Sequence, residues 1–390
     1  MFPGVLHRTR AAGVYNAVMQ IARTPLLQST EFGLYCEHGD FFVDPWRPVE
    51  RAIITHAHSD HLAWGCSRYL LAKDGLAVAR VRLARDASVD TLEYGEPLEI
   101  GGVRVSLHPA GHILGSAQIR LQHMGRVWVV SGDYKLEPDP TCASFEPLPC
   151  HVFISECTFG LPIYRWPTPD SVFRQILEWW KENHATGRAS LLYGYSLGKA
   201  QRLIAGVAKI AHESQSSLPG SIYTHGAIEP LNECYRSSGV ELPPTMRVSQ
   251  ADKGMDWSKA LVVAPPSAHG TPWTRQFGPS SSAFASGWMR IRGARRRRAV
   301  DRGFVLSDHV DWPGLMAAVD ATGAETVYLT HGYTHAAARW LSERGLDAQT
   351  LATRYQGERD EAETPPAEPP APMTQTLDEP LPGPDDEGFR

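Results

Sequence analysis

Apolar and polar residues alternate in short runs through the first 165 residues, and glycine or proline turns separate these runs. Runs of this kind predict short β-strands. Examples are "RAIITHAH", "VRVSLHPAGH", "RVWVVSGDY" and "HVFISECTFG". Several of the runs end in a histidine, an aspartate or a glutamate where the strand gives way to a loop. Side chains at such strand ends meet at the rim of a sheet, which is a usual place for a functional site.

The pattern changes after Pro167 and returns near residue 303. "DSVFRQILEWWKENH" and "GKAQRLIAGVAKIAHE" have apolar residues at helical spacing, and strand-like runs such as "ASLLYGYS" and "ALVVAPPSA" stand between and after them. This alternation predicts a smaller α/β domain inserted into a β-rich core. We therefore expect an N-terminal extension (1–23), a first part of the core (24–165), the insertion (166–302), a return to the core (303–356) and a disordered tail (357–390).

The charge of the chain is unevenly distributed. The net charge is −5, but residues 357–390 carry ten acidic residues, two basic residues and eight prolines. Such a segment cannot bury enough apolar surface to order itself, so we expect a disordered acidic tail and a mildly basic folded part. The positive charge gathers in "RIRGARRRRAVDR", a segment that is either a solvated loop or a contact surface for a phosphate backbone. The candidate nucleic-acid contacts in it are Arg292, Arg295, Arg296, Arg297 and Arg298.

Cysteine usage and hydropathy limit the compartment. The six cysteines form no CxxC pair, which argues against a cysteine zinc ribbon and against a disulfide framework. No run of about 18 uninterrupted apolar residues occurs, so we expect no membrane span. A reducing cytoplasm is the simplest interpretation.

The segment "HAHSDH" carries the densest chemistry in the chain. His56 and His58 lie two residues apart and face the same side of an extended segment, and Asp60 and His61 follow as the chain turns. Imidazole and carboxylate ligands suit Zn²⁺, Mn²⁺ or Fe²⁺. A single ion needs three or four ligands, so this cluster, with more ligands elsewhere, predicts two ions.

The remaining ligands are expected at later strand ends. His112 in "PAGHILGSA", Asp133 in "VVSGDY" and His331 in "YLTHG" each follow an apolar run and stand beside a glycine. Asp133 would bridge two ions whose other ligands are His56, His58 and His112 on one side and Asp60, His61 and His331 on the other. Two such ions can stabilise both the attacking and the leaving oxygen of a phosphodiester.

With Asp44 in "FVDP", these residues resemble the metallo-β-lactamase superfamily in order and spacing. Glu156 in "ISECTFG", His309 in "LSDHVDW" and His331 resemble motifs A, B and C of its nucleic-acid-cleaving β-CASP branch. The resemblance covers roughly residues 24–355 and implies an α/β fold, an αββα sandwich with an inserted β-CASP domain. The segments "GLYCEHGDFFVDPWRPVERAIITHAHSDH" and "RGARRRRAVDRGFVLSDHVDWPGL" look most like the bacterial ligase-associated DNA exonucleases.

The resemblance implies roles for individual residues. Asp44 would fix the orientation of a metal ligand. Asp60 and Asp133 would stand at the catalytic centre. Glu156 and His309 would form a pair near the scissile phosphate, where His309 binds an oxygen or protonates the leaving oxyanion.

The resemblance implies a dinuclear-metal nuclease that hydrolyses DNA, as an exonuclease in repair or end processing. Its cofactors would be two divalent ions, Zn²⁺ or Mn²⁺, and its partners nucleic acid, an ATP-dependent DNA ligase and a helicase. His331 keeps RNA as an alternative substrate, because histidine at motif C is associated with the RNA-cleaving members. The insertion and the arginine run argue against a small-molecule hydrolase, and a non-enzymatic scaffold would be expected to lack ligands.

"GYSLGK" (194–199) is similar to a phosphate-binding P-loop but departs from it. Only three residues separate its glycines, and Ala200 replaces the Ser or Thr that would bind Mg²⁺. We therefore expect a turn before a helix, with Lys199 near the substrate backbone.

Overall fold

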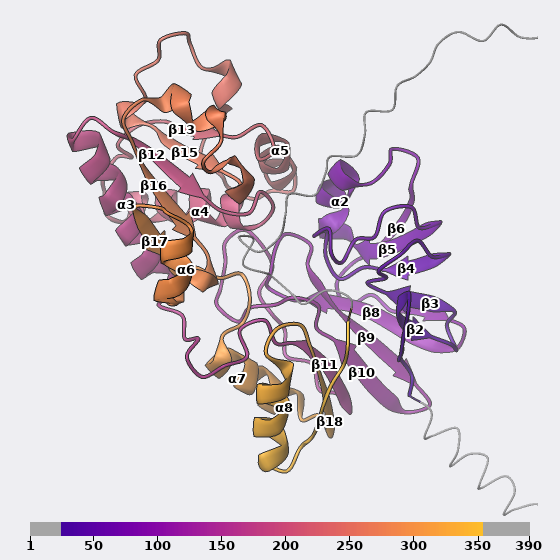
Figure 1. Cartoon of the computed structure of the whole chain (residues 1–390). Helices are drawn as coiled ribbons and strands as arrows, with labels where there is room; N and C mark the ends of the chain where they lie inside the picture. The colour runs from indigo at the N-terminus through magenta and orange to yellow at the C-terminus, as the bar shows by residue number, and fades with distance from the viewer. Residues whose placement is uncertain (1–24, 354–390) are drawn as a thin grey trace, which may run out of the picture.

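The computed structural model of the chain describes residues 25–353, except for the side chains of Ala294, Arg295 and Arg297. The expected N-terminal extension and acidic tail lie outside the described residues. The described part contains three β-sheets and the helices that cover them (Figure 1). None of its helices is long and apolar enough to cross a membrane.

The first sheet carries its six strands in sequence order, and its first three strands are antiparallel. Residues alternate between its faces: Leu70 and Ala72 point into the core between the sheets, and Tyr69 and Leu71 pack outward near helix α2 (Leu76–Arg82). The strands are β1 (Gln28–Thr30), β2 (Gly33–Cys36), β3 (Phe41–Val43), β4 (Arg51–Ile53), β5 (Arg68–Ala72) and β6 (Ser88–Leu92).

The second sheet faces the first and has seven strands in the order β19-β18-β11-β10-β9-β8-β7. Val105 and Ile119 meet the first sheet, and Val129 and Phe153 pack outward with α7 (Trp312–Thr322) and α8 (Thr334–Glu343). The two sheets between two helical layers form an αββα sandwich, which confirms the predicted fold of the core. The strands are β7 (Leu98–Ile100), β8 (Val103–Pro109), β9 (Ala117–His123), β10 (Arg126–Val130), β11 (Val152–Glu156), β18 (Thr326–Thr330) and β19 (Asp347–Thr350).

The third sheet belongs to the insertion and is all parallel, and its three central strands are short and buried on both faces. Helices α3 (Pro169–Ala185) and α4 (Lys199–Glu213) cover one face, and short 3₁₀ segments cover the other. The expected boundary at residue 302 falls inside the last strand. The strand order is β14 (Thr245–Arg247), β13 (Ile222–Thr224), β15 (Leu261–Ala264), β12 (Ala189–Tyr193), β16 (Ser280–Ala285) and β17 (Arg302–Phe304).

Two contacts fix the insertion on the core. Helix α5 (Glu229–Ser237) packs against α2, and its Leu231 and Tyr235 join the apolar cluster on the outer face of the first sheet (Figure 1). The second contact is a buried network of ion pairs at the base of α4. Nitrogen–oxygen distances in the network run from 2.9 to 3.2 Å, and its members are Lys135, Asp139, Lys199, Arg202 and Asp308.

Candidate metal centre

The candidate ligands converge where the carboxyl ends of several strands meet. His56 and His58 follow β4, and His112 follows β8. Asp133 follows β10, and His331 follows β18. Because β8, β10, β11 and β18 run in the same direction, their carboxyl ends share one edge of the second sheet. The structure therefore brings together side chains that are up to 275 positions apart in the sequence.

Three histidine nitrogens crowd together in the centre of this cluster. His58 Nδ1 lies 3.0 Å from His56 Nε2 and 3.1 Å from His112 Nε2. The outer nitrogens are already used: His58 Nε2 donates to Leu197 O over 3.1 Å, and His112 Nδ1 donates to Asp308 O over 2.8 Å. The inner nitrogens of these two rings therefore present lone pairs to each other, an arrangement that a cation between them stabilises.

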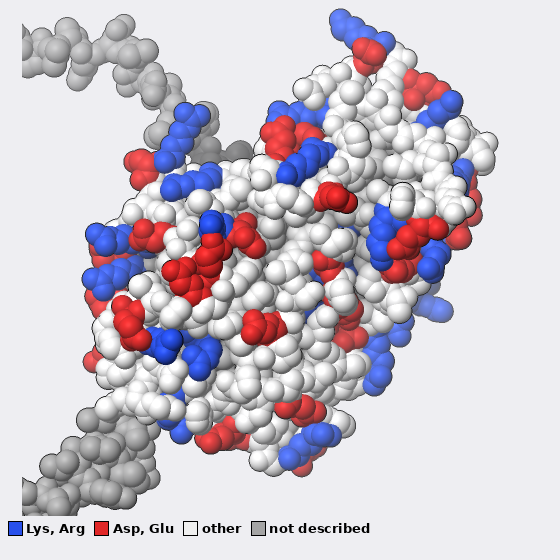
Figure 2. Space-filling model, turned by 180° about the vertical axis from the view of Figure 1, so that it is seen from behind, with Lys and Arg blue, Asp and Glu red and all other residues white. Residues whose placement is uncertain are grey.

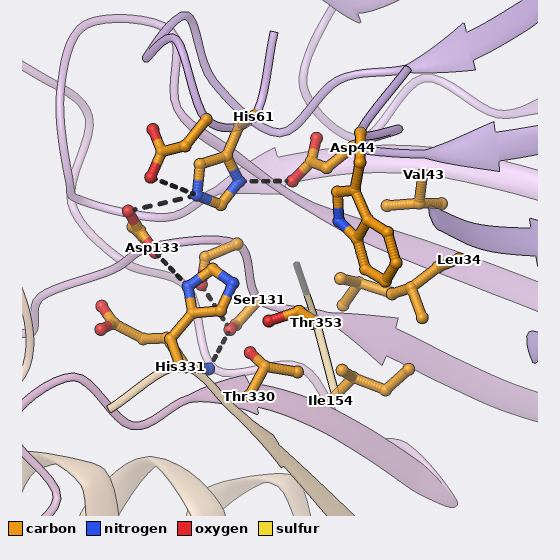
Figure 3. A pocket seen from close by; sticks show the side chains of 15 residues that line it. Leu34, Val43, Asp44, His61, Ser131, Asp133, Ile154, Thr330, His331 and Thr353 are labelled. Carbon is orange, nitrogen blue, oxygen red and sulfur yellow. Dashed lines mark hydrogen bonds and ion pairs between the residues drawn. The ribbon is translucent and has the colours of Figure 1, made fainter. Parts of the chain in front are cut away.

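Three further buried atoms have no hydrogen-bond partner within the described residues: His61 Nε2, Asp133 Oδ1 and His331 Nδ1. They face one another, and Figure 3 shows Asp133 between the rings of His61 and His331. His61 Nε2 lies 3.4 Å from Asp133 Oδ2, and His331 Nδ1 lies 4.0 Å from Asp133 Oδ1. Buried polar atoms are normally paired, so these three fit a cation held between them.

Asp133 is common to every ligand group in the cluster. Three sets of side chains have ligand atoms within 4.8 Å of one another: His56–His58–His112–Asp133, His61–Asp133–His331 and Asp133–Glu156–His309. The first two sets share one carboxylate, which is the arrangement that fits a dinuclear metal site.

Asp44 holds the His61 ring in place. Its Oδ2 accepts from His61 Nδ1 over 2.7 Å, as Figure 3 shows, and its Oδ1 accepts from the backbone N–H of Thr55 over 2.8 Å. Thr55 Oγ1 donates to the same carboxylate over 2.6 Å. Thr55 also needs a close neighbour without a side chain, because a Cβ on Gly132 (φ +58°) would lie 2.6 Å from Thr55 Cβ.

Burial and neighbouring charges set the protonation of the cluster. Burial lowers the pKa of His56 and of His112 well below the usual range, so both rings are neutral at pH 7, the form that binds a metal. Burial also disfavours charge on His61, but Asp133 and Asp44 outweigh it and raise the pKa of His61 well above its usual value. A proton on His61 thus balances Asp133, and a divalent cation can replace that proton.

Asp133 remains a carboxylate in this environment. Burial would raise its pKa, but His61 and His309 outweigh burial and hold the pKa well below the usual range. A carboxylate that stays ionised can bind a metal ion at any physiological pH.

Glu156 and His309 form a pair at the edge of the cluster. His309 Nδ1 lies 3.0 Å from both Glu156 oxygens and 3.9 Å from Asp133 Oδ2. Glu156 Oε1 also accepts from the backbone N–H of Tyr134 over 3.0 Å, so its position is fixed. Both side chains are buried.

Two predicted residues stand differently from the rest. Asp60 Oδ2 is 3.9 Å from His61 Nε2 and its side chain is 32% exposed, so Asp60 lies beside the ligand groups and its ligand role stays a prediction. Lys199 is buried, where a substrate backbone cannot reach it. It is 1% exposed, and its Nζ donates to Leu306 O and pairs with Asp308, each over 2.9 Å. The interpretation of Lys199 as a nucleic-acid contact was wrong, because its charge is compensated in the interior.

The arginine-rich segment forms the short helix α6 (Arg292–Arg297) on the insertion. Arg292 and Arg296 are exposed, whereas the guanidinium of Arg298 lies 4.0 Å from the centre of the Phe284 ring. The side chains of Arg295 and Arg297 lie outside what the structure describes. Figure 2 shows basic and acidic side chains interspersed over the face seen there. The role of this segment in binding nucleic acid stays a prediction.

A pocket of about 390 Å³ opens beside the cluster, between the core and the insertion. On the core side it is lined by the candidate ligands His58, His112 and Asp133, and Asp308 and His309 border it as well. Several other residues of its wall were not predicted from the sequence, because only the fold brings their separate segments together: Ser59, Arg82, Tyr195, Ser196, Leu197 and Pro265–Ser267.

Three relatives place the chain among known proteins, although no family model matches it. A probable DNA ligase of Opitutus terrae is 31% identical over 337 residues, which are 86% of this chain and 32% of that protein. Endoribonuclease YSH1 of Eremothecium gossypii is 28% identical over 46% of this chain and 23% of its own length. Ribonuclease TTHA0252 of Thermus thermophilus is 28% identical over 43% of this chain and 44% of its own length. The chain thus spans less than half of each of these relatives.

Proposed function

Because this chain belongs to the β-CASP branch of the metallo-β-lactamase superfamily, we propose that its histidine–aspartate cluster is the centre of a two-metal nuclease that hydrolyses DNA. The observation that carries this proposal is the position of the cluster. Its candidate ligands His58, His112 and Asp133 line a pocket between core and insertion, where an extended polymer can enter. A compact substrate would need no such second wall.

Two divalent ions, Zn²⁺ or Mn²⁺, fit the nitrogen-rich ligand set. When bound, they would lower the pKa of water and offset the charge of the phosphate. We propose that Asp133 is shared between them and that the other ligands are His56, His58 and His112 for one ion and Asp60, His61 and His331 for the other.

The protein's own side chains and carbonyls would orient the metal ligands and protonate the leaving oxygen. Asp44 fixes the His61 ring, and the carbonyls of Leu197 and Asp308 fix the rings of His58 and His112. When water adds to phosphorus, the bond from phosphorus to the leaving sugar oxygen breaks and that oxygen takes up a proton. We propose that His309, which Glu156 holds at the pocket, supplies this proton.

DNA is the proposed substrate because the ligase-named relative covers most of this chain. We further propose that the protein acts as an exonuclease in end processing in the cytoplasm, together with an ATP-dependent DNA ligase and a helicase; the name of this relative supports the association with a DNA ligase. RNA is the second candidate. Two relatives are named as ribonucleases, and His331 occupies the position where RNA-cleaving members carry histidine.

Matched oligonucleotides test the proposal. Single-stranded DNA and RNA of one sequence, labelled at either end, would be incubated with the protein and Mn²⁺ or Zn²⁺. We expect DNA to be shortened progressively from one end, and Asp133→Ala to leave it intact. Faster cleavage of RNA would replace DNA by RNA as the substrate. If both oligonucleotides stay uncleaved, the nuclease assignment is overturned.

A further inference from the structure

Among the described residues that line the pocket, Arg82 is the one lysine or arginine. It is the last residue of α2, the core helix that packs against α5 of the insertion. Its side chain is half-buried and lines the pocket beside His58 and Asp60. Arg82 thus lies at the boundary between core and insertion, which a polymer would pass on its way to the cluster.

Within residues 25–353, no carboxylate lies within 4.0 Å of the Arg82 guanidinium. Other sheltered arginines are paired: Arg202 with Asp139 and Asp308, and Arg236 with Glu229. Arg80, on the exposed side of the same helix, donates to Ala87 O. A half-buried guanidinium that faces a pocket without a counter-ion keeps its hydrogen-bond donors for a ligand.

The local field agrees with this position. Burial lowers the pKa of Arg82, and Asp60 opposes that shift from beyond ion-pair distance. The charge of Arg82 in turn contributes to the low pKa of His58, after burial. The guanidinium is therefore charged and within electrostatic range of the cluster, yet no cluster atom is bonded to it.

We propose that Arg82 binds a phosphate of the substrate strand next to the scissile one. The planar guanidinium matches a phosphate diester with two parallel hydrogen bonds. The scissile phosphate belongs at the metal-binding cluster, whose side chains Arg82 does not contact, so the phosphate that Arg82 holds is a neighbouring one. This contact sets which bond of the strand lies over the cluster. The inference rests on the proposed nuclease function.

Kinetics on single-stranded DNA test it with Arg82→Met, Arg82→Lys and the matched control Arg80→Met. We expect Arg82→Met to raise KM about ten- to a hundredfold with a small change in kcat, because a charge-assisted contact is lost. Arg82→Lys should restore part of this loss, and Arg80→Met should resemble the wild type. The slope of log(kcat/KM) against log[salt] should become shallower by about 0.7 for the one lost phosphate contact.

A neutral linkage identifies the phosphate. A single methylphosphonate would be placed at successive positions of the strand. It should raise the KM of the wild type most at one position beside the cleaved bond, and the KM of Arg82→Met should not change at that position. If Arg82→Met keeps the wild-type KM, or stays sensitive at every position, the inference is wrong. A loss of melting temperature with no position dependence would assign Arg82 a structural role instead.

A binding measurement separates this inference from the nuclease proposal. Fluorescence anisotropy with a labelled oligonucleotide would be recorded for the Asp133→Ala protein with and without Arg82→Met. Weaker binding in the double variant supports the inference even if the wild type cleaves neither DNA nor RNA. Equal binding in the two proteins overturns it while leaving cleavage by the wild type unaffected.

Discussion

His58, in the core, donates its Nε2 proton to the carbonyl oxygen of Leu197, in the insertion, over 3.1 Å. The ring nitrogen that faces the cluster is therefore selected by a residue of the other domain. Asp308 does the same for His112 from the segment where the chain returns to the core. The insertion thus helps to build the candidate metal centre as well as the pocket wall.

Loss of Asp133 should remove both ions. Its carboxylate belongs to all three ligand groups, and Asp133→Ala leaves the two groups that it shares between the ions with histidines alone. We expect elemental analysis to find about two ions per wild-type chain and fewer than one per variant chain, with an unchanged far-UV circular dichroism spectrum. Full metal content in the variant would contradict the shared role.

Loss of Asp44 should weaken the binding of only one of the two ions. Asp44 fixes His61, which is absent from the group of His56, His58 and His112. Outer partners of this kind contribute about 10- to 100-fold to metal affinity. Calorimetric titration of Asp44→Ala should show one weakened and one unchanged site. Asp90→Ala, at an exposed position of β6, is the control, and equal weakening of both sites would oppose the pairing.

Metal removal should lower the stability of the protein. Three buried ligand atoms lack partners, and the central ring nitrogens crowd one another, so a cation relieves both costs. At a free concentration of 100 times Kd, one site adds about 2.7 kcal/mol. Differential scanning calorimetry after chelation, then with Zn²⁺ or Mn²⁺ restored, should show a reversible rise in Tm. The rise should be absent in Asp133→Ala.

Loss of Glu156 should affect the reaction more than the metal content. Glu156→Gln keeps the shape but weakens the hold on His309, whose ring lies 3.0 Å from both oxygens. We expect kcat to fall about 10²- to 10⁴-fold, as for loss of a positioned proton donor, with the metal content retained. The pH–rate profile should lose its limb for the proton donor. Loss of metal together with activity would make Glu156 a ligand instead.

Asp308 should be required for folding stability. Burial would raise its pKa, but Lys199 and Arg202 outweigh burial and hold the pKa far below the usual range. Removing one partner from a buried ion pair costs about 3 to 5 kcal/mol, so Asp308→Ala should lose about that much at pH 7 in urea unfolding. Asp320→Ala, at an exposed position of α7, should be neutral.

The pH dependence of Asp308 has a definite sign. The unfolded carboxyl has a pKa of about 3.9 and the folded one a much lower value, so the unfolded state binds more protons in acid. The stabilisation is complete above about pH 5 and declines as pH falls below about 4. The difference in unfolding free energy between the wild type and Asp308→Ala should therefore shrink between pH 5 and pH 2.

Much of the fold was accessible from the sequence. Apolar alternation before residue 165 and helical spacing after Pro167 reflect which faces are buried. In the sandwich, the buried faces of the two sheets form one apolar core. The cluster residues were accessible for a similar reason. His56, His112, Asp133 and His331 each lie within three residues of the end of an apolar strand, so their place at a sheet rim is local information.

Tertiary structure decided the rest, because it depends on which segments meet. Lys199 stands in a glycine turn that suggested a phosphate contact, yet α4 lies against the return segment and Lys199 neutralises Asp308. Arg82 ends an ordinary helix with no motif, and only the packing of α2 against the insertion turns it towards the pocket. Residue types and strand order are written along the chain, whereas the partner of a charge depends on distances between segments that the chain does not encode locally.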